Sequence, residues 1–321
     1  MFCYRSYRHS RRKRQRLLTL ALPLLALLTL TLPFYIIYKP PHLLIRYLAS
    51  RYPDILWHVP STSLAQPFIA LTFDDAPSEY TPEILRLLRE NDAHATFFLI
   101  GDHIPGREGL LRDAVNEGHE LANHAMFDQP SQELSDEELA AQIQAVQSRI
   151  QRIYASAGRQ AEAHDGVIEQ SSLVGAGAAG AGAGAGSPQD SNGDGNGDGD
   201  ESGNGNGNNE GGVEAFGPGR YFRPGSGFFT DRMRALVQRE GFRIVLGSVY
   251  PHDPQISVPW VNAAHVLSMA RSGSIIIVHD RRPWTVPMLA LVLPELKRRG
   301  CRVGTVTDLL REGAGVSASV E

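Results

Sequence analysis

The chain has 321 residues, of which 42% are hydrophobic and 21% are charged, as in a globular protein that can bury a core. Its formal net charge is -4, yet residues 1–16 carry seven basic residues and no acidic one, so this segment contributes +7 and leaves -11 for the rest. A basic head directly before an apolar run is typical of the cytosolic flank of a membrane span, and this argues against a nucleic-acid partner.

The uncharged segment 17–38 is about long enough to cross a hydrocarbon core of roughly 30 Å. Phe34, Tyr35 and Tyr38 lie where an interfacial aromatic belt is expected. A cleaved signal peptide is the alternative, but the residues after Tyr38 lack the small-residue pattern of a cleavage site. We therefore expect a single-pass membrane protein with a cytosolic tail at 1–16, a signal anchor at 17–38, and a luminal or extracellular body.

After a proline-containing stalk at 39–66, apolar β-like runs alternate with amphipathic helical patterns. Strands are expected at 68–73, 94–100, 120–123, 221–222, 243–249, 274–278 and 302–305, and helices at 81–90, 109–117, 134–154, 230–240, 261–272 and 286–299. Such alternation predicts a parallel sheet with helical crossovers, either open or closed into a barrel. The body with this alternation is expected to span 67–312, with 313–321 as a tail.

One long segment, 157–217, interrupts this order with Gly-Ala alternation followed by a tract of Gly, Asp and Asn. It has almost no apolar side chain larger than alanine, so it cannot offset the entropy of ordering, and we expect a disordered insert. Within it a calcium-loop pattern is met by Asp190, Asn192, Asp194, Gly195 and Glu201. Tracts of this composition match that pattern by chance, and no helix is expected to flank it. A calcium-sensing membrane protein is therefore an interpretation that rests on this pattern alone.

Five short stretches place a carboxylate, an imidazole or a guanidinium at or just after the end of a β-like run. In chain order they are Thr72-Phe73-Asp74-Asp75, Asn123-His124 with Asp128, Phe222-Arg223-Pro224-Gly225, Tyr250-Pro251-His252-Asp253 and Ile277-Val278-His279-Asp280. Each alone has an ordinary explanation as a turn, a capping aspartate, a surface ion pair or a packed histidine. Because strand ends converge at one rim of a barrel, the five together predict the active site of a metal-assisted hydrolase.

These motifs, in this order over residues 68–310, resemble the polysaccharide deacetylase family, which is the NodB-homology domain of carbohydrate esterase family 4 and includes the chitin deacetylases. The resemblance implies an α/β fold, a distorted (β/α) barrel of about seven strands. It also implies metal-dependent removal of acetyl groups from glycans that contain N-acetylglucosamine, such as chitin or chitooligosaccharides. The sequence points to no protein partner.

The resemblance also implies a role for each motif. The general base would be Asp74, the metal ligands Asp75 and His124, the partner of the base Arg223, and the acid for the leaving amine His279 with Asp253 beside it. The substrate would contact Pro224, Gly225 and Tyr250. The expected cofactor is a divalent metal, Zn²⁺ foremost, with Co²⁺ or Mn²⁺ as alternatives.

The main departure from the family pattern is Asp128, which stands where a second metal-binding histidine is usual. An aspartate oxygen is an acceptable zinc ligand, so we expect Asp128 to complete the metal site, with His119 and His252 as the remaining candidates if it does not. The altered motifs also allow a catalytically impaired, membrane-anchored glycan-binding protein on the same barrel. The presence of Asp74 speaks against this alternative, because a pure binder has least need of a base.

Overall fold

The computed structural model describes residues 3–173 and 220–317. The chain divides into two compact units, 1–157 with 215–321 and 158–214. Of the second unit the structure describes only residues 158–173, which are helical. Most of the predicted insert, including the calcium-loop pattern, lies outside the described residues.

Helix α1 (Cys3–Tyr38) contains the expected apolar span and continues through Pro23 and Pro33. Its window Ala21–Tyr38 has a mean hydropathy of 1.9 and is not buried against the protein. Among the described residues it is the one helix long and apolar enough to cross a membrane. Both a membrane anchor and a signal sequence have these properties.

The residues expected to form a stalk pack against the body. Helix α2 (His42–Arg51) buries Ile45, and the chain after it buries Ile55, Leu56 and Trp57. Leu56 forms a parallel bridge with Val245. This segment therefore contributes part of the wall of the catalytic fold.

The body is built on a seven-stranded sheet in which every strand pairing is parallel. The strands are β1 (Phe68–Ala76), β2 (Thr96–Leu99), β3 (Glu120–Asn123), β4 (Tyr221–Phe222), β5 (Arg243–Ile244), β6 (Ile275–His279) and β7 (Arg302–Gly304). Their order is β5-β4-β3-β2-β1-β6, and β7 pairs with the first residues of β1. A bridge from Val249 to Ile276 joins the chain beyond β5 to β6, so the sheet curls into a distorted barrel. The predicted fold class is confirmed.

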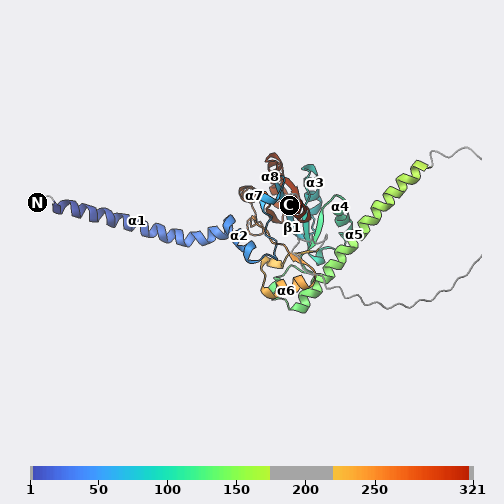
Figure 1. Ribbon diagram of the computed structural model, residues 1–321, viewed down its shortest axis with the longest axis horizontal. Coiled ribbons are helices and arrows are strands. Elements are labelled where there is room, and N and C mark those ends of the chain that lie inside the picture. Colours follow the sequence, from blue (N-terminus) through green and yellow to red (C-terminus); the bar gives the residue numbers. More distant parts are fainter. Residues whose placement is uncertain (1–2, 174–219, 318–321) are drawn as a thin grey trace, which may run out of the picture. The chain divides into compact units, whose positions relative to one another are not determined.

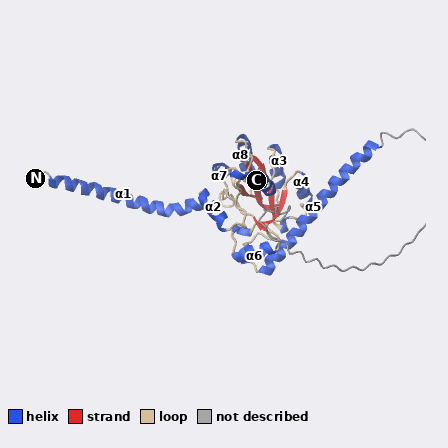
Figure 2. Cartoon of the chain, viewed as in Figure 1, coloured by secondary structure: helices blue, strands red, loops and turns tan. Residues whose placement is uncertain are grey.

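Helices cover the outside of the strands (Figures 1 and 2). They are α3 (Thr81–Glu90), α4 (Glu108–Asn116), α5 (Asp136–Leu173), α6 (Asp231–Arg239), α7 (Pro259–Met269), α8 (Thr285–Arg298) and α9 (Val306–Ser317), with short 3-10 turns at Ser61–Ser63, Gly101–His103, Ser131–Glu133 and Gly225–Gly227. Helix α5 begins with a capping box, in which Ser135 N–H donates to Glu138 Oε2 and Glu138 N–H donates to Ser135 Oγ.

Several elements differ from their expected bounds, among them β1, β5 and α5. Strand β1 runs on to Ala76, so the two acidic residues that were expected to follow it lie inside it. Strand β5 ends at Ile244, well before the expected 249, because beyond it Leu246 N–H bonds Leu56 O and Val249 bridges Ile276. Helix α5 runs to Leu173, beyond its expected end at 154.

The two faces of the sheet bury different side chains, because successive residues of a strand point to opposite sides. On β1, Ile69, Leu71 and Phe73 belong to the cluster that packs against α3 and α8. Phe68 and Ala70 belong to the cluster inside the barrel, together with Tyr221 of β4. This inner series, continued toward the carboxyl ends of the strands, leads to the polar residues of the site.

Candidate active site

The alternation of side chains along the strands brings three of the predicted residues to one interior. The inner series Phe68, Ala70 and Thr72 continues to Asp74 on β1, and Tyr221 on β4 is followed two residues later by Arg223. On β6 the same spacing leads to His279, whose backbone is in register with Asp74. Parallel strands end at the same rim, so these groups converge without any long loop to carry them.

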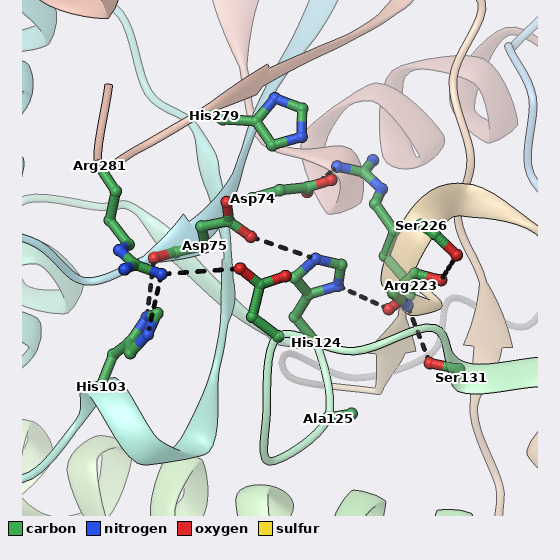
Figure 3. Close-up of polar contacts among 12 residues, drawn as sticks. Asp74, Asp75, His103, His124, Ala125, Ser131, Arg223, Ser226, His279 and Arg281 are labelled. Atoms are coloured by element: carbon green, nitrogen blue, oxygen red, sulfur yellow. Dashed lines mark hydrogen bonds and ion pairs between the residues drawn. The ribbon is translucent and has the colours of Figure 1, made fainter. Parts of the chain in front are cut away.

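Asp75 reaches the same interior because the backbone of β1 is irregular there. Its φ is 63°, in the left-handed region, and the pairing with β2 shifts register between Phe73 and Ala76. A bulge of this kind interrupts the alternation that would otherwise send Asp75 to the opposite face from Asp74. Both carboxylates consequently line one cavity, and Figure 3 shows them side by side.

Asp74 and Arg223 form a buried ion pair at the centre of the site. Arg223 Nη1 lies 2.5 Å from Asp74 Oδ1 and also donates to Thr72 Oγ1 at 2.8 Å, and Nε donates to Val245 O at 2.9 Å. The guanidinium carbon stands 3.9 Å from the ring centroid of Phe98. Burial opposes ionisation of Asp74, but Arg223 and then His124 and His279 outweigh burial and hold its pKa below the ordinary value. Asp74 is therefore an ionised carboxylate, as a proton acceptor must be.

His279 is held by Asp253 through two contacts. Asp253 Oδ2 accepts from the backbone N–H of His279 at 2.8 Å, and Oδ1 lies 3.0 Å from His279 Nδ1. Asp253 is fully buried, and Trp284 Nε1 donates to its backbone carbonyl. Burial opposes the imidazolium, but the charge and hydrogen bond of Asp253 prevail and raise the pKa of His279 to about 9. His279 is thus protonated at neutral pH and can donate a proton.

His124 sits on the turn after β3 and faces Asp75. Its Nδ1 lies 2.7 Å from Arg223 O, and because a carbonyl only accepts, Nδ1 carries the proton and the lone pair is on Nε2. Nε2 lies 3.7 Å from Asp75 Oδ1 (Figure 3). The turn is fixed by Asn123, whose Oδ1 accepts from Ala125 N–H and whose Nδ2 donates to Ile143 O.

Asp75 and His124 fit two ligand positions of one divalent metal. An imidazole whose other nitrogen donates to a carbonyl is the usual form of a metal-binding histidine. Burial raises the pKa of Asp75, and a cation beside it would favour the ionised form. Such a metal would supply positive charge that polarises a bound carbonyl and acidifies water.

The predicted third ligand, Asp128, makes other contacts than Asp75 and His124 do. Its side chain is 59% exposed, and its Oδ2 lies 3.7 Å from Arg281 Nη1. Within the described residues, no three His, Cys, Asp or Glu side chains are grouped closely enough to hold a metal ion together. Asp128 does line the same cavity as Asp75 and His124.

The other two candidates for a third ligand lie elsewhere. His119 is buried, its Nδ1 accepts from Ala95 N–H, and burial together with His94 and Arg89 lowers its pKa to about 3. His252, with a φ of 57°, stacks on Tyr38 at a centroid distance of 5.3 Å, and its Nε2 lies 3.2 Å from Tyr38 O. Both histidines have structural contacts that occupy them.

A cavity of about 570 Å³ lies over these groups, large enough for a sugar residue. Of the predicted substrate contacts, Pro224 and Tyr250 line it, and Tyr250 meets the ring of His279 edge-on at 5.8 Å. Gly225 is not among the lining residues; its N–H donates to Ser131 Oγ, and a Cβ there would lie 2.1 Å from Gln129 O. Its role in the structure is close backbone packing.

Among the lining residues that were not anticipated from the sequence, three bring large or charged side chains to the cavity. Trp57 comes from the segment expected to be a stalk, and Phe228 is a 68% exposed ring at the mouth. Arg282 Nη2 lies 3.4 Å from Asp75 Oδ2. The Arg281-Arg282 doublet directly after His279-Asp280 was a visible signal, since cations at the rim of a carboxylate site bear on its charge. Trp57 gave no signal, because only the tertiary fold brings it to the rim.

Comparison with known proteins agrees with this geometry. Residues 62–180 match the family model described as polysaccharide deacetylase. A peptidoglycan-N-acetylglucosamine deacetylase of Bacillus cereus is 28% identical over 267 residues, covering 80% of this chain and 93% of that protein. A chitooligosaccharide deacetylase of a Bradyrhizobium species is 26% identical over 258 residues, covering 75% of this chain and 90% of that protein.

Solved structures share the fold at lower identity. The peptidoglycan deacetylase PdaC of Bacillus subtilis matches with a TM-score of 0.57 and 21% identity, over 80% of this chain and 96% of that one. A Bacillus anthracis protein described as a CE4 family pseudoenzyme matches with a TM-score of 0.56 and 20% identity, over 80% of this chain and 69% of that one. The fold therefore accompanies both active and inactive sites. With the family match over residues 62–180, the relatives along most of its length and the shared fold, this chain carries a polysaccharide deacetylase domain, the kind found in hydrolases that act on N-acetyl amides.

Proposed function

We propose that this chain removes acetyl groups from N-acetylglucosamine residues of a glycan with the help of a divalent metal. One observation carries this proposal: an ionised, buried carboxylate (Asp74) and a protonated imidazole (His279) face one cavity. They are the base and the acid that amide hydrolysis requires. Asp75, His124 and the exposed Asp128 line the same cavity, where a metal would be held.

In this proposal the chain's own residues move two protons. Asp74 takes a proton from the attacking water as the carbon–oxygen bond forms, and Arg223 keeps Asp74 ionised until then. His279 gives its Nε2 proton to the amide nitrogen as the carbon–nitrogen bond breaks, while Asp253 orients the ring through Nδ1. The products are acetate and a free amine on the sugar.

The metal is expected to be held by Asp75, His124 and Asp128, with zinc foremost because its ligands are commonly histidine nitrogen and carboxylate oxygen. When bound, it would stabilise the negative charge that develops on the carbonyl oxygen. The two basic side chains at the rim, Arg281 and Arg282, offset part of the negative charge of this ligand set. Co²⁺ and Mn²⁺ accept the same ligands.

The substrate is proposed to be chitin, a chitooligosaccharide or another polymer of N-acetylglucosamine. The cavity is lined by the rings of Trp57, Phe228 and Tyr250 beside the charged groups, as suits an amphipathic sugar ring. The named activities of the Bacillus cereus and Bradyrhizobium relatives support the same sugar, in peptidoglycan and in chitooligosaccharides respectively.

The protein is proposed to work from a membrane, with α1 as its anchor and the catalytic body outside the cytosol. The apolar window of α1 and the basic residues before it support this topology. Glycans of this kind lie outside the cytosol, which agrees with the orientation.

A catalytically impaired glycan-binding protein is the second candidate. The exposed Asp128, paired with Arg281 instead of standing beside His124, favours it. The retained pair of Asp74 with Arg223 and the retained pair of His279 with Asp253 favour the enzyme, since binding alone requires neither.

The deciding experiment measures acetate released from chitooligosaccharides and from peptidoglycan by the purified full chain. We expect release that a chelator abolishes and added zinc restores. The Asp74→Asn variant, which keeps the shape of the site, is the control for background hydrolysis. Binding of the oligosaccharide without acetate release under any metal would establish the second candidate.

A further inference from the structure

A second cavity, of about 240 Å³, lies at the junction between the end of α1 and the body. Its walls come from the last residues of α1, the start of α2, and the loop before β6. The basic side chains on these walls are Lys39, His42, His58 and Arg271. No carboxylate lines it.

Within the residues that the structure describes, the positive charges at this cavity form no ion pairs. In the described part of the chain, no ion pair includes Lys39, Arg46 or Arg271, although Arg46 lies on α2 close enough to act on His58. The rings of His42 and His58 meet edge-on at 5.7 Å, and His58 Nδ1 is buried without a hydrogen-bond partner. Burial, His42 and Arg46 together lower the pKa of His58, so it is the neutral form that is left without a partner.

The start of α2 adds to the positive potential. Pro41 stands at its N-cap with no side-chain hydrogen bond, and the first turn contains no acidic residue. The N-terminal end of a helix carries a partial positive charge, which an acid or a bound anion normally offsets. Here cations gather at that end instead, which is unfavourable unless an anion occupies the cavity.

The place of the cavity along the chain indicates where the anion comes from. The apolar window of α1 ends at Tyr38, and the first basic lining residue is Lys39. If α1 spans a membrane, as proposed above, Lys39 lies at the level of the lipid headgroups on the side of the body, within reach of a lipid phosphate.

We propose that this cavity binds the phosphate of an anionic phospholipid headgroup. The lipid would offset the charges of Lys39 and Arg271 and accept a hydrogen bond from His58 once that imidazole is protonated or in its Nδ1–H form. The inference rests on the proposed membrane anchor. The phospholipid would then bind the folded body as a ligand, in addition to surrounding α1 in the bilayer.

The test uses the full chain in bilayer nanodiscs of phosphatidylcholine alone and of phosphatidylcholine mixed with phosphatidylglycerol. The parent is expected to melt at a higher temperature with phosphatidylglycerol, since a ligand of the native state raises stability. In Lys39→Gln/Arg271→Gln this gain should vanish, and the affinity for phosphatidylglycerol should fall by about 30-fold, the loss expected for two basic residues at a membrane surface. The matched control is Arg239→Gln/Arg311→Gln, which removes two exposed basic residues elsewhere and should keep the gain.

The outcomes are separable. Equal melting of parent and double variant in both lipids overturns the cavity inference and leaves the anchor intact. A gain of equal size when inorganic phosphate is added to phosphatidylcholine nanodiscs also overturns it, because the source of the anion is then free phosphate. Failure of the parent to float with phosphatidylcholine vesicles contradicts the anchor itself, and acetate release from soluble oligosaccharides is independent of either result.

Discussion

Asp253 contacts both the backbone and the ring of His279. Its Oδ2 accepts a hydrogen bond from the backbone N–H of His279 at 2.8 Å, and its Oδ1 lies 3.0 Å from the ring Nδ1. One carboxylate thereby sets the position, the tautomer and the charge of the imidazole. In the other pair of the site, Arg223 sets the position and the charge of the Asp74 carboxylate. The two buried pairs act in opposite directions, since one keeps His279 protonated and the other keeps Asp74 ionised, as their proposed roles as acid and base require.

Asp253→Asn should move the alkaline limb of the activity profile to lower pH. His279 has a raised pKa of about 9, so it is protonated and active as an acid below that pH and loses its proton as pH rises through it. Without the charge of Asp253, burial favours the neutral ring and the pKa falls. Turnover measured from pH 6 upward checks this; an unchanged alkaline limb would mean that another group limits the rate there.

Asp74→Asn should abolish turnover and also destabilise the protein. Removal of a general base costs roughly 10²–10⁴ in rate. The buried charge of Arg223 would lose its partner, which costs about 3–5 kcal/mol in the free energy of unfolding. Acetate release and chemical denaturation measure the two effects, and zinc affinity, which should stay near the parent value, shows that a base and not a ligand was removed.

Asp128→Ala should weaken zinc binding by more than the roughly 10–100-fold that loss of an outer-shell partner costs. Asp128→His should hold or raise activity, because a neutral imidazole leaves the metal better able to acidify water. Calorimetric titration with zinc decides between a ligand and an exposed partner of Arg281. Asp102→Ala, a change of another nearby exposed carboxylate, is the control and should bind zinc as the parent does.

Gly225→Ala should lower the melting temperature, because its Cβ would lie 2.1 Å from Gln129 O, and backbone must move to relieve that contact. Overpacking of this kind costs about 1–3 kcal/mol. Gly109→Ala on α4, where the nearest atom is 3.7 Å away, should melt no lower than the parent. Equal melting of both variants would show that the turn after Arg223 adapts freely.

Tyr38→Ala should lower turnover although Tyr38 lies at the end of α1. Its ring stacks on His252, the residue before Asp253, and His252 meets Tyr250 at 4.7 Å. Displacement of this loop by about 1 Å can cost up to about 100-fold in rate, and it should shift the alkaline limb as Asp253→Asn does. Phe34→Ala, 70% exposed on the same helix, is the control. Full activity in a fragment that begins at residue 51 would contradict this role.

The fold could be predicted because strands and helices alternate regularly and because parallel strands end at one rim. For the same reason the positions of Asp74, His124, Arg223 and His279 could be expected: each follows an apolar run with the period of a strand. What the pattern could not contain is the backbone irregularity at Asp75 and the tertiary contact that brings Trp57 to the cavity. Arg281 and Arg282 were visible as a charge doublet, but their contacts with Asp128 and Asp75 depend on the turn after β6.

The left-handed backbone at Asp75 limits which residues can replace this aspartate. At a φ of 63° most side chains clash with their own backbone, and aspartate, asparagine and glycine are the residues that tolerate it best. Of these, only aspartate also brings a negative oxygen to His124. Two independent requirements, one steric and one chemical, therefore restrict which residue can stand at position 75. Nearly every substitution there would remove the proposed metal ligand and strain β1 at the same time, so a different metal-binding residue could hardly arise at this position without loss.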